Sequence, residues 1–283
     1  MCRLMMFNRQ FALEHNETEL ADIFNRLNSI QGGHGMGIFL SGDTPKLVKG
    51  VKIKGKRLAK EVYRSLVSNK PFDYGLFHCR LAGPAGSICD ENSQPYYDVD
   101  TDICLAHNGV AYELCNSKYD YSDTELLLKI MAEYGIPHKN LEYFSGVFIG
   151  TNKGVPFVVK GAEWTDLHLL YHEETGAWCF ISVPLYPFNR SPYRTVRIKK
   201  AVWQGHNVDQ IYVDALATQY RSYPVQRFVD GKWVEEDTGL VNETFTPYIP
   251  RTSAISSMTD KEWNEWEAEH DRQVDEHLEN LGE

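Results

Sequence analysis

The second residue of the chain is a cysteine, and this position permits a self-contained form of nucleophilic catalysis. Initiator methionine is normally removed before a small residue, and removal of Met1 gives Cys2 a free α-amino group beside its own thiol. An α-amine has a pKa near ~8, so its neutral form can take the thiol proton at physiological pH. Cys2 then supplies both the nucleophile and the general base for attack on a carbonyl carbon. The alternative is that the small residue at position 2 has no catalytic role.

Two further features have residue types that could stabilise an intermediate and hold a substrate. His107-Asn108-Gly109 places a side-chain amide next to a backbone N–H, and two such donors can form an oxyanion hole for a tetrahedral intermediate. Arg80 follows an apolar segment, and an arginine there can bind a carboxylate through two parallel hydrogen bonds. The alternatives are an ordinary hairpin turn and a surface arginine.

A third feature, Ser122-Asp123-Thr124-Glu125, has the capping-box pattern that opens a helix. The helix dipole favours an acidic residue in the first turn, so capping alone would explain Asp123. The same carboxylate could instead accept hydrogen bonds from the ammonium group of a substrate.

The elements that must position these residues follow from hydrophobic periodicity and turn signals. Asn108-Gly109 is a hairpin signal that requires positive φ at both central positions, and Asp230-Gly231 is a second one. Hairpins outnumber parallel crossovers, so we expect an α+β fold with mostly antiparallel strands. The expected helices cover residues 17–30, 58–66 and 122–131, and the expected strands cover 4–7, 38–40, 75–78, 103–106, 110–112, 147–149, 156–159 and 178–181.

Charge and hydropathy exclude several classes of partner. The net charge is −10, and residues 259–283, with ten acidic and two basic side chains, account for eight of these charges. An acidic chain with a nearly neutral body is not expected to bind nucleic acid. No stretch approaches the ~18 apolar residues that span a bilayer, and the N-terminus lacks the apolar segment of a signal peptide. We therefore expect a cytoplasmic protein that does not contact a membrane.

No metal or organic cofactor is expected. The six cysteines form no C-x-x-C pair and no spacing typical of metal ligands. A basic run between Lys46 and Lys60 could face an anionic partner, but it is better explained as the solvated face of a strand-turn-helix unit. Thr259-x-x-Glu262 opens a final amphipathic helix, which carries two tryptophans and could dock on the chain's own body or on a partner.

The order and spacing of these motifs carry more information than any one of them. They run from Met1-Cys2-Arg3-Leu4 through Gly32-Gly33-His34-Gly35-Met36-Gly37, His78-x-Arg80, Asn92-x-Gln94-Pro95 and His107-Asn108-Gly109 to Ser122-Asp123-Thr124-Glu125. This series resembles the class II glutamine amidotransferase (glutaminase) domain of the N-terminal-nucleophile hydrolases. The resemblance covers residues 2–185, and the Met-Cys-Arg-Leu start is similar to that of small stand-alone members.

The resemblance implies a fold and a reaction. The fold would be a four-layer αββα sandwich of two antiparallel sheets over residues 2–185, followed by an irregular β-rich extension over 186–258 and an acidic amphipathic helix over 259–283. Cys2 would attack the glutamine side-chain amide, form a γ-glutamyl thioester and release ammonia, and water would then release glutamate.

The resemblance also implies a role for each candidate residue. Arg80 would bind the α-carboxylate of the substrate, and Asp123 would bind its α-ammonium. Asn108 and Gly109 would form the oxyanion hole beside Cys2.

Several positions depart from the family pattern. Leu81 and Gly83 stand where an aromatic residue and a threonine or serine are usual, Phe77 stands where glycine is usual, and Gln94 replaces a common histidine. A hydroxyl that would help to hold the substrate carboxylate is therefore missing, and this leaves room for an amide larger than free glutamine.

Three functions follow from these observations. The first is a glutaminase that supplies ammonia to a separate synthase or ligase, because no nucleotide-binding motif follows residue 185. The second is a stand-alone hydrolase of a γ-glutamyl or peptide-like amide. The third is an inactive binding or regulatory module on the same fold. The sequence predicts no oligomeric state.

Overall fold

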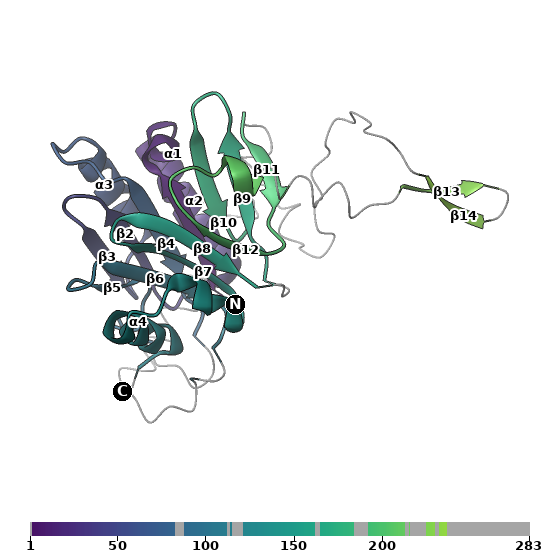
Figure 1. Ribbon diagram of the computed structural model, residues 1–283. Helices are drawn as coiled ribbons and strands as arrows, with labels where there is room; N and C mark the ends of the chain where they lie inside the picture. Colours follow the sequence, from purple (N-terminus) through teal and green to yellow (C-terminus); the bar gives the residue numbers. More distant parts are fainter. Residues whose placement is uncertain are drawn as a thin grey trace.

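The computed structural model describes residues 2–82, 88–111, 114, 121–161, 165–183, 192–212, 215, 225–229 and 232–236. Helices and strands follow one another along this part of the chain in an irregular order, with adjacent strands such as β2 and β3 or β7 and β8 (Figure 1). In chain order they are β1 (Arg3–Asn8), α1 (Arg9–Leu13), α2 (Glu17–Gln31), β2 (Met36–Ser41), β3 (Lys46–Gly50), α3 (Gly55–Leu66), β4 (Tyr74–Cys79), β5 (Tyr96–Asp98), β6 (Ile103–Asn108), α4 (Asp123–Tyr134), η2 (His138–Tyr143), β7 (Val147–Asn152), β8 (Val155–Lys160), β9 (His168–His172), β10 (Ala177–Ile181), β11 (Arg194–Arg197), β12 (Ala201–Gln204), β13 (Val225–Val229) and β14 (Lys232–Glu236).

Two antiparallel sheets form the body of the protein. The first sheet has the strand order β11-β9-β10-β1-β4-β2-β3, so β1 is its middle strand, and the second has the order β12-β8-β7-β6-β5. In the first sheet Leu4 of β1 lies opposite His78 of β4, and Met5 lies opposite Ile181 of β10. The segment that begins with Cys2 therefore runs through the centre of the larger sheet.

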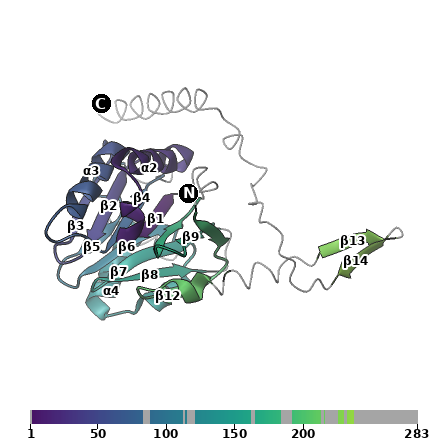
Figure 2. The ribbon, with the colours of Figure 1, turned by 90° about the horizontal axis from the view of Figure 1, so that it is seen from above.

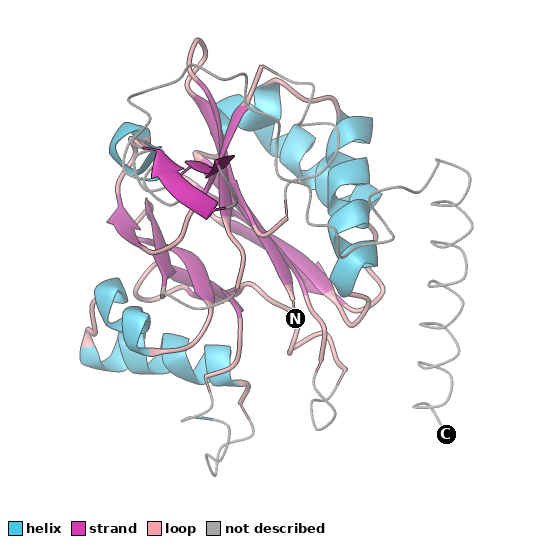
Figure 3. Ribbon diagram, turned by 90° about the vertical axis from the view of Figure 1, so that its right-hand side faces the viewer, coloured by secondary structure: helices cyan, strands magenta, loops and turns pink. Residues whose placement is uncertain are grey.

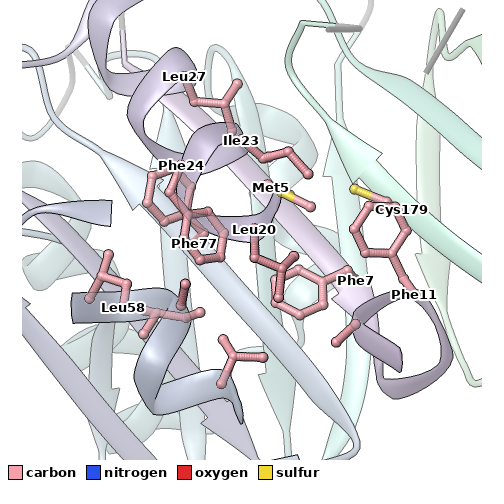
Figure 4. Packing of buried hydrophobic residues seen from close by; sticks show 14 of the residues in the cluster. Met5, Phe7, Phe11, Leu20, Ile23, Phe24, Leu27, Leu58, Phe77 and Cys179 are labelled. Carbon is pink, nitrogen blue, oxygen red and sulfur yellow. The ribbon is translucent and has the colours of Figure 1, made fainter. Parts of the chain in front are cut away.

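Alternation along β1 explains how the layers pack. Met5 and Phe7 point to one face, where they pack with α1, α2 and α3, whereas Leu4 and Met6 point to the other face, toward the second sheet. Figure 4 shows the helix-side cluster, in which Phe24 of α2 stacks on Phe77 of β4 with ring centroids 4.6 Å apart.

A third apolar cluster joins the second sheet to α4. Leu105 of β6 and Phe157 of β8 pack there with Leu127 and Met131 of α4. Seen from above, α2 and α3 lie on one side of the sheets and α4 on the other (Figure 2), and Figure 3 shows the same sequence of layers. Three apolar interfaces separate four layers, so the predicted αββα sandwich and its α+β class are confirmed.

The predictions for the chain after residue 185 have mixed outcomes. The expected C-terminal helix over 259–283 lies outside the described residues. β11 and β12 come after residue 185 yet form edge strands of the two sheets, while β13 and β14 form the hairpin expected around Asp230-Gly231, with Val229 opposite Lys232. The division of the chain at residues 185 and 258 stays a prediction. Within the described residues, no helix is long and apolar enough to cross a membrane.

The basic run between Lys46 and Lys60 forms the expected strand-turn-helix unit, β3 and α3, and some of its side chains make internal contacts. Lys49 Nζ donates to the carbonyl oxygens of Glu91 (2.8 Å) and Ser93 (2.7 Å) and lies 4.3 Å from the centroid of the Tyr96 ring. Lys49 thus fixes the loop that precedes β5.

Glu61 of α3 is a buried carboxylate surrounded by three cations. Its side chain is 1% exposed and pairs with Lys46, with Arg57 (3.3 Å) and with Arg64 (2.8 Å). The hydrogen bond from Lys46, with the neighbouring positive charges, holds the pKa of Glu61 below its usual value. Each cation is about half exposed, so water can solvate it when the carboxylate is lost.

We expect Glu61→Gln to lower the free energy of unfolding by about 1–3 kcal/mol at pH 7. A carboxylate with a lowered pKa stabilises the fold fully above its unfolded pKa of about 4.3, and this contribution is lost as the pH falls through the folded pKa. Urea unfolding at pH 7 and at pH 4 should therefore show a smaller pH dependence in Glu61→Gln than in the wild type. Glu133→Gln, an exposed change on α4, is the control; equal effects of the two changes would contradict the prediction.

Candidate active site

Cys2 lies directly before β1, at the end of the sandwich that we call the Cys2 end. The start of β1 is fixed because Leu4 N–H donates to Ser182 Oγ (3.1 Å) and Leu4 O accepts Ser182 N–H (3.1 Å). Continuing the alternation of Leu4 and Met6, the side chain of Cys2 faces the space between the sheets. It is 9% exposed, and its Sγ accepts the backbone N–H of Leu81 at 3.4 Å.

Burial dominates the titration of the Cys2 thiol. It raises the pKa of the thiol, while the hydrogen bond from Leu81, the N-terminal charge and Arg80 act in the opposite direction, and Asp123 raises the pKa further. A thiol of this kind is protonated at neutral pH, so it needs a base close by before it can attack a carbonyl.

Arg80 follows β4, and the glycine-rich segment 32–37 holds its backbone. Its N–H donates to Gly35 O at 2.7 Å, and its carbonyl accepts His34 N–H at 3.1 Å. Gly35 has φ +127°, and a Cβ there would collide with Ser93 Oγ, so only glycine fits between the two segments. Arg3 lies opposite Cys79 in an antiparallel pair, so Cys2, which precedes Arg3, comes beside Arg80, which follows Cys79.

Asn108 is the last residue of β6 and lies opposite Val147 of β7. Cys104 and Ala106 of β6 point into the space between the sheets. Alternation along the strand directs Asn108 into the same space, which Cys2 faces from the first sheet. Asn108 is fully buried, yet neither its Nδ2 nor its Oδ1 has a hydrogen-bond partner. Buried polar groups are nearly always paired, so such an amide needs an explanation.

The predicted hairpin turn at Asn108-Gly109 is wrong. β6 continues through Asn108, and its partners are β5 and β7. Neither Asn108 nor Gly109 has a positive φ. Glycine is required for another reason: a Cβ on Gly109 would lie 2.6 Å from Ser145 O and 2.8 Å from Gly146 Cα. The backbone after β6 runs too close to the backbone before β7 for any larger residue.

His107 points away from Cys2, toward α4, and is held at several atoms. Its Nε2 lies 2.7 Å from Ser145 O, its ring stacks on Phe148 with centroids 4.0 Å apart, and its backbone N–H donates to Gln94 Oε1 at 2.8 Å. Gln94 Nε2 in turn donates to Thr124 Oγ1 of α4 at 3.1 Å. The residue before Asn108 is thus tied to the second sheet and to α4.

Asp123 is the first residue of α4, and Ser122 is its N-cap, as predicted. Asp123 Oδ2 accepts the backbone N–H of Ala111 at 2.8 Å and lies 3.8 Å from His107 Nδ1, while Oδ1 accepts Thr124 N–H at 2.8 Å. The carboxylate therefore connects α4 to the segment that follows Gly109. Oδ1 also accepts a hydrogen bond from Thr124 Oγ1 at 3.3 Å.

The structure brings all the predicted site residues to the Cys2 end. A hydrogen bond connects the two sheets at this end: His78 Nε2 of β4 donates to His107 O of β6 at 3.1 Å. Cys2 and Arg80 thus lie on the first sheet, facing Asn108 and Gly109 on the second. Among the described residues, no three histidine, cysteine or acidic side chains are grouped so that they could hold a metal ion.

Three residues of this region received no role from the sequence: His78, Gln94 and Thr124. All three stood inside motifs, in His78-x-Arg80, Asn92-x-Gln94-Pro95 and Ser122-Asp123-Thr124-Glu125, but none was given a role of its own. Alternation along β4 could have placed His78, because Tyr74 and Leu76 face the second sheet. No local signal predicts the contact from Gln94 to His107, which depends on the approach of a loop to β6.

Comparison with known proteins adds a likeness in fold. No protein-family model and no curated protein matches the sequence. Similar solved structures include a glutamine phosphoribosylpyrophosphate amidotransferase from B. subtilis, with 19% identity and a TM-score of 0.45 over 73% of this chain and 49% of that chain. Another is described as the allosteric regulatory enzyme of purine biosynthesis, with 18% identity, a TM-score of 0.46 and the same coverage of both chains.

A third similar structure is a glutamine aminotransferase class-II domain protein from Silicibacter pomeroyi, with 12% identity, a TM-score of 0.41 and coverage of 72% of this chain and 98% of that chain. The chain spans about half the length of the first two proteins. Likenesses at this level do not decide the activity, and the four-layer sandwich rests on the contacts described above.

Proposed function

We propose that the protein is an N-terminal-nucleophile amidohydrolase that cleaves the side-chain amide of glutamine through a thioester on Cys2. The observation that carries this proposal is the buried, unpartnered amide of Asn108, which faces the same space between the sheets as Cys2. An unpaired buried amide costs about 1–3 kcal/mol. Such a cost is typical of a preorganised group whose partner arrives with the substrate.

In the proposed reaction, removal of Met1 frees the α-amine of Cys2, which takes the thiol proton. The thiolate attacks the amide carbon, and the developing oxyanion accepts hydrogen bonds from Asn108 Nδ2 and Gly109 N–H. The C–N bond then breaks, the proton held by the α-amine passes to the leaving nitrogen, and ammonia departs. Water attacks the resulting thioester through a second oxyanion, which releases glutamate and restores the thiol.

Arg80 and Asp123 are proposed to recognise the amino-acid end of the substrate. Arg80 would bind the α-carboxylate and Asp123 the α-ammonium, since both groups carry the complementary charge and influence the pKa of the Cys2 thiol. The ammonia would pass to a separate synthase or ligase. A γ-glutamyl amide larger than glutamine is the second candidate substrate, because Leu81, whose backbone contacts Cys2 Sγ, offers no hydroxyl or aromatic ring beside the sulfur.

Intact-protein mass spectrometry with a diazo-ketone analogue of glutamine tests the proposal. We expect a protein lighter by one methionine that gains one adduct, and we expect Cys2→Ala to gain none. Cys179→Ala, at another fully buried cysteine, should keep the adduct. A processed protein without an adduct would favour the larger γ-glutamyl amide as substrate. An assay of γ-glutamyl anilide hydrolysis would then show turnover. A protein that retains Met1 would contradict the mechanism and favour an inactive module.

A further inference from the structure

The peptide groups on both sides of His107 are held by side chains from different parts of the fold. The backbone N–H of His107 donates to Gln94 Oε1 (2.8 Å), and the carbonyl oxygen of His107 accepts a hydrogen bond from His78 Nε2 (3.1 Å). The carbonyl of His107 belongs to the peptide that leads directly into Asn108. Any shift of this peptide would move the Asn108 amide and the Gly109 N–H with it.

The bond from His78 has a defined direction. A carbonyl oxygen only accepts, so Nε2 must carry the proton, and Nδ1 is then an acceptor. Burial lowers the pKa of His78 to about 3, so the ring is neutral and has this single N–H to donate. Nδ1 is buried and has no hydrogen-bond partner. The ring is therefore held in one tautomer at the cost of an unpaired nitrogen.

The same bond connects the two halves of the candidate site. His78 lies on β4, opposite Leu4 of β1, so it belongs to the sheet that carries Cys2. His107 lies on β6 of the second sheet. The separation of the Cys2 sulfur from the oxyanion-binding pair thus depends on how the two sheets stack, and a hydrogen bond at this point fixes the stacking next to the chemistry.

We propose that His78 is a positioning residue that holds Asn108 and Gly109 over Cys2 by donating its Nε2 hydrogen bond to the carbonyl of His107. The inference rests on the proposed function and extends it. Oxyanion donors act only when they meet the oxygen at hydrogen-bond distance, and a displacement of about 1 Å can cost 10²-fold in rate. His78 would affect the transition state without touching the substrate.

The conservative variants make the proposal specific. The terminal NH₂ of glutamine reaches the position of a histidine Nε2, whereas that of asparagine reaches the position of Nδ1, and leucine offers no donor. We expect kcat for glutamine hydrolysis to fall about 10–100-fold in His78→Leu and His78→Asn, with KM within about twofold of the wild type. His78→Gln should return kcat to within about threefold of the wild type.

His168 provides the matched control. It is also a histidine of the first sheet with a buried, unpartnered Nδ1, and burial lowers its pKa to about 4. It lies on β9, where its pairs are Ile181 and Arg197, and it makes no bond to β6. His168→Leu and His168→Gln should leave kcat unchanged. Equal losses at the two histidines, or equal kcat in His78→Leu and His78→Gln, would overturn the proposal.

A second readout is independent of turnover. In the full-length chain, deuterium exchange of the peptide that contains residues 103–111 should be faster in His78→Leu and His78→Asn than in the wild type and His78→Gln. Alkylation of Cys2 by iodoacetamide, which forms no oxyanion, should proceed at the same rate in all of them. A wild type that hydrolyses no amide would reject the proposed function, while the exchange rates would still decide whether His78 holds His107; unchanged exchange in His78→Leu would show that it does not.

Discussion

Cys2→Ala is expected to abolish amide hydrolysis, with a loss of about 10⁴-fold or more in kcat. The change removes the atom that forms the thioester. Among the described residues, the thiol of Cys79, which lies one residue before Arg80, is buried in the helix-side cluster and so does not face the space between the sheets. Loss of one buried sulfur atom should cost only about 1 kcal/mol of stability. Release of ammonia and glutamate, followed in parallel with thermal unfolding, measures the two effects separately.

Cys179→Ala is the matched control for this experiment. Cys179 is fully buried in β10, and burial holds the pKa of its thiol well above its usual value, as expected for an inert cysteine. Its loss should leave hydrolysis unchanged. Hydrolysis that persists in Cys2→Ala, or disappears equally in Cys179→Ala, would show that the nucleophile lies elsewhere.

Asn108→Leu is expected to change activity and stability in opposite directions. Loss of the Nδ2 donor should lower kcat by about 10²–10³-fold with little change in KM, because the oxyanion exists only in the transition state and intermediate. Since both amide atoms are buried and unpartnered, an apolar side chain of similar size removes their desolvation cost. The free energy of unfolding should therefore rise by about 1–2 kcal/mol, which denaturant titration can measure.

Thr151→Val separates the two effects. Thr151 lies on β7 of the second sheet, is fully buried, and its Oγ1 also has no partner. It lies opposite Cys104, away from the Cys2 end, so the substitution should stabilise the protein without lowering kcat. If Asn108→Leu destabilised the protein or kept full activity, Asn108 would be a structural residue rather than an oxyanion donor.

Local signals predicted the elements whose stability is itself local. The helix expected at residues 17–30 is α2, Glu17–Gln31, and it begins with a capping box in which Asn16 and Glu19 bond to each other's backbone N–H groups. The helix expected from Ser122 begins there because the Ser122 side chain accepts Glu125 N–H. The N-terminus of each helix depends on residues within one turn, which a sequence pattern can represent.

The arrangement around Asn108 could not be predicted in this way. A short polar residue followed by glycine has the same local pattern in a hairpin turn and at the end of a strand that runs close beside another segment. Here the contacts that decide between them come from Ser145 and Gly146, 36 and 37 residues after Gly109. The resemblance to known glutaminase domains supplied the correct layers, because it contains the long-range packing that periodicity lacks.

Two glycine-containing turns at the end of the sandwich opposite Cys2 have free space around them, unlike the glycines near Cys2. Gly154, in the turn between β7 and β8, and Gly176, in the turn between β9 and β10, would each meet nothing within 4 Å if they carried a Cβ. Both turns lie at the ends of strands that lead away from the Cys2 end. Exposed turns of this kind accept inserted sequence readily. A reporter or an immobilisation tag can therefore be inserted at these turns. An N-terminal fusion, by contrast, would block the α-amine of Cys2 that the proposed mechanism needs.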